Sequence, residues 1–205
     1  CGGPRGAQCT SALHAKRFAP RGTWPQPAAT FTFSELFAGV GGFGVALRAL
    51  GGRCVFASEV DVQACGTYAA NFGEVPSGDI TEIDERDVPP HDVLTAGFPC
   101  QRFSRCGDGG GFAVDALFFH VVRVLVAARP RGFLLENVAE FAAHDGGFTR
   151  RVAVAALEAA GYATTWRVVD ALALLPQHRD RCYLVGVRRD AGAGAYAWPP
   201  LPRVR

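Results

Sequence analysis

Residues 31–44 read FTFSELFAGVGGFG, an apolar run that passes directly into a loop rich in glycine. The apolar run predicts a β-strand over about residues 31–37. The glycines permit a tight turn and let backbone N–H groups approach a ligand at the start of the following helix. The stretch therefore predicts a strand, a turn that binds a small anionic or zwitterionic group, and a helix.

Short apolar runs and helical patterns alternate from this unit to about residue 190. Such alternation predicts an α/β fold, with a mostly parallel sheet and helices on both faces. The last two strands are joined by a segment too short for a crossover helix, so they are expected to pair antiparallel at one edge. The expected strands lie at about 31–37, 53–58, 92–96, 132–136, 163–170 and 181–188, and the helices at about 43–50, 61–71, 113–128 and 147–160.

The chain divides into three expected regions. Residues 1–30 mix Gly, Pro, Arg and Ala without apolar periodicity, which predicts a disordered or loosely attached leader. Residues 31–190 are expected to form one domain around one core. Residues 191–205 are again rich in Gly, Ala and Pro and form the expected tail. The sequence contains no methionine, even at position 1, so we expect a fragment of a longer polypeptide.

Charge and cysteine content narrow the class of protein. The 21 basic residues nearly balance the 19 acidic ones, so bulk charge neither indicates nor excludes a nucleic-acid partner. The seven cysteines include no Cys-x-x-Cys pair, which argues against a zinc site and a compact disulfide framework. Reduced thiols and an intracellular location are expected. No long apolar run or signal-peptide pattern is present, so a soluble protein is expected.

Two acidic residues after the glycine loop predict a cofactor that contains a nucleoside. Glu59 ends the second expected strand, where its carboxylate could accept hydrogen bonds from both ribose hydroxyls. Asp79 is expected at the end of a third strand and could accept one from an adenine amino group. Gly39, Gly41 and Gly44 also form the dinucleotide spacing G-x-G-x-x-G, with Glu59 at the matching distance. An NAD-dependent enzyme, or a turn that serves packing alone, therefore remains open at this point.

A thiol follows the strand expected at 92–96. The run GFPCQRFS places Cys100 at the carboxyl end of a parallel strand, where open sheets build their sites. A lone cysteine is more often a small buried hydrophobe, but Pro99 restrains the approach to this one, and Gln101 and Ser104 supply polar contacts. The glycine-rich residues 105–111 are flexible enough to close over a substrate. Cys100 is therefore a candidate nucleophile.

Two further segments place polar groups at the same edge of the expected sheet. Glu136 and Asn137 follow the apolar strand at 132–136, where partial desolvation would favour a protonated carboxyl and a role as proton donor. In isolation, a glutamate that caps the next turn is the simpler interpretation. Gln177, Arg179 and Arg181 precede the last strand, and the two guanidinium groups could hold Glu136 and a base carbonyl. A solvated edge is the alternative.

Six motifs follow one another along the chain, namely FAGVGG (37–42), Glu59, GDI (78–80), FPCQ (98–101), ENV (136–138) and QHRDR (177–181). In this order they resemble the cytosine-C5 DNA methyltransferase family, particularly its compact bacterial modification enzymes. Residues 141–145, FAAHD, are similar to that family as well, and the resemblance covers about residues 31–190.

The resemblance implies a Rossmann-like fold, S-adenosyl-L-methionine as cofactor and double-stranded DNA as substrate. It implies that Cys100 attacks C6 of a cytosine flipped out of the duplex. Glu136 would protonate or share a proton with N3, and Arg181 would hold O2. Arg179 and Gln177 would support these two groups.

The resemblance also assigns binding residues. A monomer without a metal or a membrane contact is expected. Gln101, Ser104, Asn137 and Gln177 would contact the substrate. The cofactor would lie against Phe37, Ala38, Gly39, Gly41, Gly42, Glu59, Val60, Asp79, Ile80 and Pro99.

Some features depart from the family pattern. Glu35 stands where the family usually has aspartate, and nothing after Asp190 is expected to supply the target-recognition region or the closing motif. DNA sequence specificity therefore cannot be inferred. A transfer RNA cytosine-C5 methyltransferase on the same scaffold, and a remnant that binds cofactor or DNA without turnover, remain alternatives.

Overall fold

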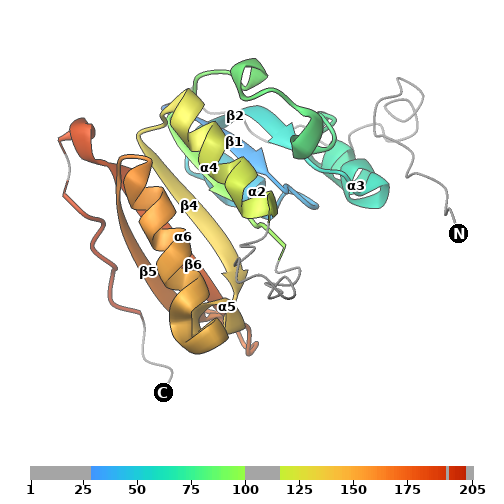
Figure 1. The fold of residues 1–205 in the computed structure, drawn as a ribbon. Coiled ribbons are helices and arrows are strands. Elements are labelled where there is room, and N and C mark those ends of the chain that lie inside the picture. The colour runs from blue at the N-terminus through green and yellow to red at the C-terminus, as the bar shows by residue number, and fades with distance from the viewer. Residues whose placement is uncertain (1–28, 100–115, 193, 202–205) are drawn as a thin grey trace, which may run out of the picture.

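A computed structural model describes residues 29–99, 116–192 and 194–201 of the chain. Its centre is a six-stranded sheet with the strand order β2-β1-β3-β4-β6-β5 (Figure 1). The neighbours β2, β1, β3 and β4 pair parallel, whereas β6 pairs antiparallel with both β4 and β5. The strands are β1 (Phe31–Leu36), β2 (Gly52–Ser58), β3 (Val93–Ala96), β4 (Gly132–Val138), β5 (Tyr162–Asp170) and β6 (Asp180–Arg188).

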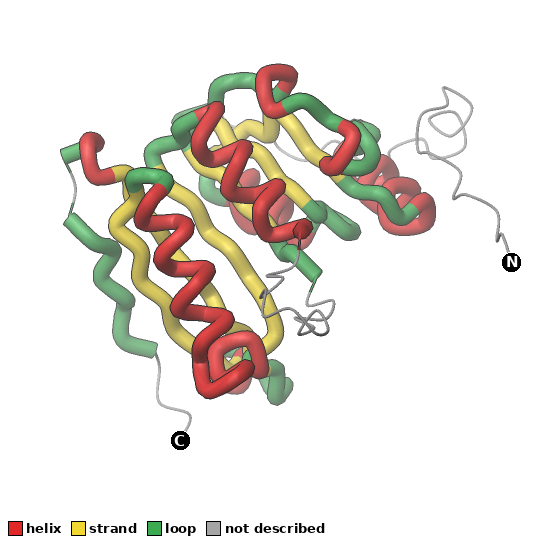
Figure 2. The backbone as a smooth tube through the Cα atoms, in the orientation of Figure 1, coloured by secondary structure: helices red, strands yellow, loops and turns green. Residues whose placement is uncertain are grey.

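Helices lie on both faces of this sheet (Figure 2). The helices α4, α5 and α6 lie on one face, and α2 and α3 lie on the other, over β1 and β2. Their bounds are α2 (Gly42–Ala49), α3 (Val62–Phe72), α4 (Ala116–Ala128), α5 (Glu140–Ala143) and α6 (Phe148–Ala159). The mostly parallel α/β fold expected from the alternating pattern is confirmed. Among the described residues, no helix is long and apolar enough to span a bilayer.

The alternation of each strand between two faces gives the molecule two apolar clusters. On β1, Phe33 packs with the cluster that contains Tyr68 of α3, whereas Leu36 packs with the larger cluster under α4 and α6. On β4, Phe133 and Leu135 both face the larger cluster. Because successive side chains of a strand point to opposite faces, a sheet covered on both faces needs apolar residues at nearly every position. In β1, Phe33 and Leu36 meet this condition, whereas the buried polar residues Ser34 and Glu35 each make a hydrogen bond instead.

Polar contacts join β1 to His91 and Asp92, the two residues before β3. They lie at the end of the sheet where the parallel strands begin. The Thr32 N–H and hydroxyl both donate to Oδ2 of Asp92, at 2.8 and 3.0 Å. The His91 Nδ1 lies 2.8 Å from the Pro89 carbonyl, so it carries the proton, and Nε2 accepts from the buried Ser34 hydroxyl at 2.9 Å. Burial lowers the pKa of His91, which fits this neutral state.

The position of Asp79 differs from the sequence-based prediction. We expected it at the end of a strand, but residues 74–79 form no strand, and Asp79 caps the 3₁₀ helix η1 (Ile80–Glu82), its side chain accepting from the Thr81 N–H at 2.8 Å. Pro76 has no N–H to donate to a strand ladder, and Ser77 makes one backbone bond to Ala57. A second 3₁₀ helix, η2 (Glu85–Asp87), follows. The short helix α5 was also not expected.

The antiparallel strand β6 comes very close to β4 at one glycine. Gly186 is paired with Phe133, and a Cβ built on Gly186 would lie 2.2 Å from the Phe133 ring. The ring is buried in the larger cluster and cannot move outward into solvent. Gly186 is therefore required where an aromatic residue of β4 lies over β6.

We predict that Gly186→Ala lowers the free energy of unfolding by about 1–3 kcal/mol, the usual cost of overpacking a core. Denaturant titration followed by circular dichroism measures the change. Gly194→Ala is the matched control, because a Cβ there meets nothing within 4 Å. Equal stability of the two variants would show that the close contact with Phe133 does not prevent a side chain at position 186.

Candidate active site

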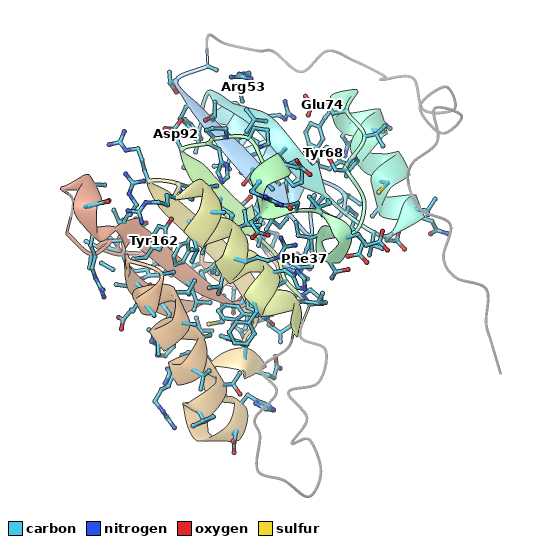
Figure 3. All side chains as sticks on the ribbon, turned by 45° about the horizontal axis from the view of Figure 1, so that its top comes forward. Phe37, Arg53, Tyr68, Glu74, Asp92 and Tyr162 are labelled. Atoms are coloured by element: carbon cyan, nitrogen blue, oxygen red, sulfur yellow. The ribbon has the colours of Figure 1, made fainter. Side chains whose placement is uncertain are left out.

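The loops that follow the parallel strands meet at one edge of the sheet and enclose a cavity of about 540 Å³. Phe37 lies on this edge, near the start of α4, whereas Arg53 and Asp92 lie at the opposite end of the strands (Figure 3). A cavity of this size is within the usual range for small-molecule sites, about 300–1,000 Å³. Its lining residues are Phe37, Gly39, Ser58, Glu59, Val60, Asp79, Ile80, Gly97, Pro99 and Leu117.

Glu59 is fixed on one wall of the cavity by backbone donors. Its Oε2 accepts from the Gly39 N–H at 2.8 Å, and its Oε1 accepts from the N–H groups of Val60 and Asp61 at 2.9 and 2.8 Å. A carboxylate has about four acceptor positions, so it retains capacity for a hydroxyl group of a ligand. The bond to Gly39 ties β2 to the glycine loop and holds this carboxylate at the cavity.

The glycines of the loop divide between binding and packing. Gly39 has a φ of 56° and lines the cavity, and a Cβ there would meet no protein atom within 4 Å. A Cβ on Gly41 would lie 2.1 Å from the Phe72 ring of α3, and one on Gly44 would lie 3.2 Å from it. The loop therefore needs Gly41 and Gly44 so that α2 can approach α3.

The predicted cofactor residues are mostly brought together. Seven of them line the cavity, namely Phe37, Gly39, Glu59, Val60, Asp79, Ile80 and Pro99. Three do not: Ala38 and Gly41 are buried in packing, and Gly42 is exposed at the start of α2. The binding roles of all ten stay predictions.

Sequence reasoning missed three residues that line the cavity. Ser58 precedes Glu59 and donates to the Gly78 carbonyl at 2.7 Å, which closes the cavity behind the carboxylate. Gly97 comes directly after β3, a position that the strand-end argument could have identified. Leu117 lies on α4 and is brought to the cavity only by helix packing, so no local pattern marks it.

An ion pair lies beside this cavity. The Arg181 Nε donates to Oε1 of Glu136 at 2.8 Å, and both side chains are about a quarter exposed. A Cβ on Gly97 would lie 3.5 Å from Oε2 of Glu136. Since Gly97 also lines the cavity, the cavity and the ion pair are neighbours across this one glycine.

Asn137 anchors the segment that leads to the predicted nucleophile. Its side chain is buried, donates to the Phe98 carbonyl at 3.1 Å and accepts from the Val138 N–H at 2.8 Å. This bond holds the backbone two residues before Cys100. The side chain therefore supports the loop of the site from beneath, and contact with a substrate stays a prediction for Asn137.

The remaining predicted residues are exposed or lie outside the described part of the chain. Gln177 and Arg179 are exposed before β6, where the Arg179 N–H donates to Oδ1 of Asp170 at 2.9 Å. Cys100, Gln101 and Ser104 lie outside the described residues. Within the described ranges, no group of three His, Cys, Asp or Glu residues could hold a metal ion.

These features agree with comparisons against known proteins. The family model described as C-5 cytosine-specific DNA methylase matches residues 31–200. The chain belongs to this family of C-5 cytosine-specific DNA methylases. The predicted family is thereby confirmed, and the NAD-dependent alternative loses its support.

Similar proteins are found among curated sequences, and a similar fold is found among solved structures. The Type II methyltransferase M.DsaV of Dactylococcopsis salina is 45% identical over 157 residues, which are 75% of this chain and 45% of that protein. M.HhaI of Haemophilus parahaemolyticus is 41% identical over 170 residues, 82% of this chain and 52% of that protein. The Dnmt2 methyltransferase of S. pombe has a TM-score of 0.67 at 23% identity, covering 80% of this chain and 53% of that one. The methylase chain thus spans about half the length of the curated relatives it matches.

A buried carboxyl supports the glycine loop of the methylase chain from below. Glu35 is 1% exposed, and its Oε1 accepts from the Gly44 N–H at 3.2 Å. Burial raises the pKa of Glu35 to about 7, against the opposing effects of the Gly44 N–H and the charge of Arg48. Arg48 is itself buried and pairs with Glu74 at 2.7 Å.

We predict that Glu35→Gln removes a pH-dependent destabilisation. The raised pKa means that the folded state favours the protonated carboxyl, so the wild type loses stability as the pH rises from about 4.5 to 7, by roughly 1–3 kcal/mol. The stability difference between variant and wild type should grow over this interval. Denaturant titrations at pH 5 and pH 8 measure it, with Glu140→Gln as the exposed control. A difference that is independent of pH would contradict the prediction.

Proposed function

We propose that this chain is the catalytic part of an enzyme that transfers a methyl group from S-adenosyl-L-methionine to C5 of cytosine in DNA. The observation that carries the proposal is the Glu136–Arg181 pair, which lies beside a cavity that also contacts Pro99, the residue before Cys100. A carboxyl group and a guanidinium next to a cofactor-sized cavity meet the needs of chemistry on a pyrimidine. The enzyme would act inside the cell, where DNA is found.

The cavity fits the cofactor that this family uses. Carboxylates at Glu59 and Asp79 suit ribose hydroxyls and an adenine amino group, and the half-buried Phe37 and the buried Ile80 supply apolar side chains to the lining. The open space at Gly39 admits a ligand where a Cβ would otherwise stand. When bound, the sulfonium cofactor supplies the methyl group.

The residues of this chain would activate the cytosine. Cys100 would add to C6 as a thiolate, which makes C5 nucleophilic enough to accept a methyl group. Loss of the C5 proton to a base and elimination of the Cys100 thiolate from C6 would then restore the ring and release the product. Glu136 would share or donate a proton at N3, so that negative charge does not accumulate on the ring. Arg181 would hold O2 while its Nε keeps Glu136 in place. The cytosine would have to leave the duplex, because its C6 is shielded within the base stack.

The first test concerns Cys100. We predict that Cys100→Ala abolishes methyl transfer while binding of S-adenosylhomocysteine stays nearly unchanged, because the thiol takes part in chemistry rather than in affinity. Incorporation of a radioactive methyl group into unmethylated genomic DNA, with transfer RNA as a parallel substrate, measures the reaction. DNA containing 5-fluorocytosine should trap a cofactor-dependent covalent adduct on the wild type and on the control Cys54→Ala. Methylation of C5 by Cys100→Ala would refute the assignment.

The second test concerns Glu136. Glu136→Gln should slow methyl transfer by about 10²–10⁴-fold, the range expected when a positioned proton donor is lost. Single-turnover rates on the same DNA measure the effect. Glu140→Gln, an exposed glutamate at the start of α5, is the matched control and should keep the wild-type rate. An unchanged rate for Glu136→Gln would remove this carboxyl from the mechanism.

A further inference from the structure

One arginine of α4 joins the two sides of the cavity. Arg123 donates from Nη2 to the Ile80 carbonyl of η1 at 2.5 Å, and from Nη1 to Oε2 of Glu85 on η2 at 2.7 Å. Its Nε donates to Nδ1 of His120, one turn earlier on α4, at 2.9 Å. All three directions of the guanidinium fork are therefore used. The side chain is only about a quarter exposed.

The two segments that Arg123 joins line the cavity near Asp79. Asp79 and Ile80 line it from the side of η1, and Leu117 lines it from α4. Residues 79–87 contain only two 3₁₀ helices of three residues each, and such short helices have little stability of their own. Their distance from α4 must be set by tertiary contacts, and Arg123 supplies the polar ones described above.

The same contact fixes the state of His120. Because its Nδ1 accepts from Arg123, the ring is neutral and carries its proton on Nε2. Burial and the charge of Arg123 lower the pKa of His120, whereas Asp79 raises it, so the imidazole lies within the field of that carboxylate. Glu85 on η2 pairs with the same guanidinium that contacts His120. Arg123 thus orders both the backbone and the imidazole near Asp79.

We infer that Arg123 is a positioning residue that sets the distance between η1 and α4 across the cavity. Through this distance it would control the recognition of the adenine base of the cofactor. The inference rests on the proposed function for the cofactor itself. Arg123 does not line the cavity and acts through Ile80, Asp79 and His120. A lysine would supply the charge without the fork, since its ammonium is a compact point charge.

The experiment measures binding of S-adenosylhomocysteine and of its inosine analogue to the protein by isothermal titration calorimetry. Arg123→Met should weaken the binding of S-adenosylhomocysteine by about 10- to 100-fold, as expected for the loss of charge-assisted hydrogen bonds. It should also reduce the preference for adenine over hypoxanthine, which a general loss of stability would not do. Arg123→Lys should recover part of the affinity, and Glu85→Gln should have a smaller effect.

The control is Arg86→Gln, since Arg86 lies on η2 but pairs with Asp84, two residues earlier, and is largely exposed. This variant should bind like the wild type. If the wild type binds neither ligand, the proposed function fails and the inference fails with it. If the wild type binds and Arg123→Met and Glu85→Gln keep both affinity and base preference, the inference alone is overturned. Should Arg123→Met not fold, Arg123→Lys and Glu85→Gln decide the outcome by the same two measurements.

Discussion

The site depends on the ion pair between Glu136 and Arg181, and the ion pair depends on the direction of β6. Arg181 is the second residue of β6 and lies opposite Val138, the last residue of β4. Because the two strands are antiparallel, the start of one meets the end of the other. A strand rises about 3.3 Å per residue, so reversal of the nine-residue β6 would move Arg181 by six residues, roughly 20 Å, toward the far edge of the sheet. Within the ladder, Arg181 lies diagonal to Glu136, a separation that a long side chain can bridge.

The parallel strands bring the remaining groups to the same edge. β2 ends before Glu59, β3 ends before Gly97, and β4 carries Glu136 near its end. Gly97 stands between the cavity and the ion pair, and the absence of a side chain there keeps the two compartments close. A cofactor in the cavity and a pyrimidine at the ion pair could therefore approach each other without a change in the sheet.

The glycine loop couples this edge to the smaller apolar cluster. Gly41 and Gly44 allow α2 to rest on Phe72, and the carboxyl of Glu35 accepts the Gly44 N–H beneath the loop. The second oxygen of Glu35 is buried without a hydrogen-bond partner among the described residues, which is consistent with a pKa raised by burial. The geometry at Gly39 thus depends on packing several residues away.

The sequence by itself determined the α/β class, most element positions and the family, because alternating apolar runs and ordered motifs are local signals. It also predicted that Glu59 and Glu136 lie at one edge of the sheet, since the carboxyl ends of parallel strands converge. It offered Arg181 as a partner for Glu136, but their contact depends on the antiparallel pairing of β6 with β4. Only the tertiary structure decided that Asp79 caps a 3₁₀ helix, that Leu117 lines the cavity and that Arg123 joins α4 to η1. These depend on how a helix packs across a loop, and no spacing along the chain encodes that distance.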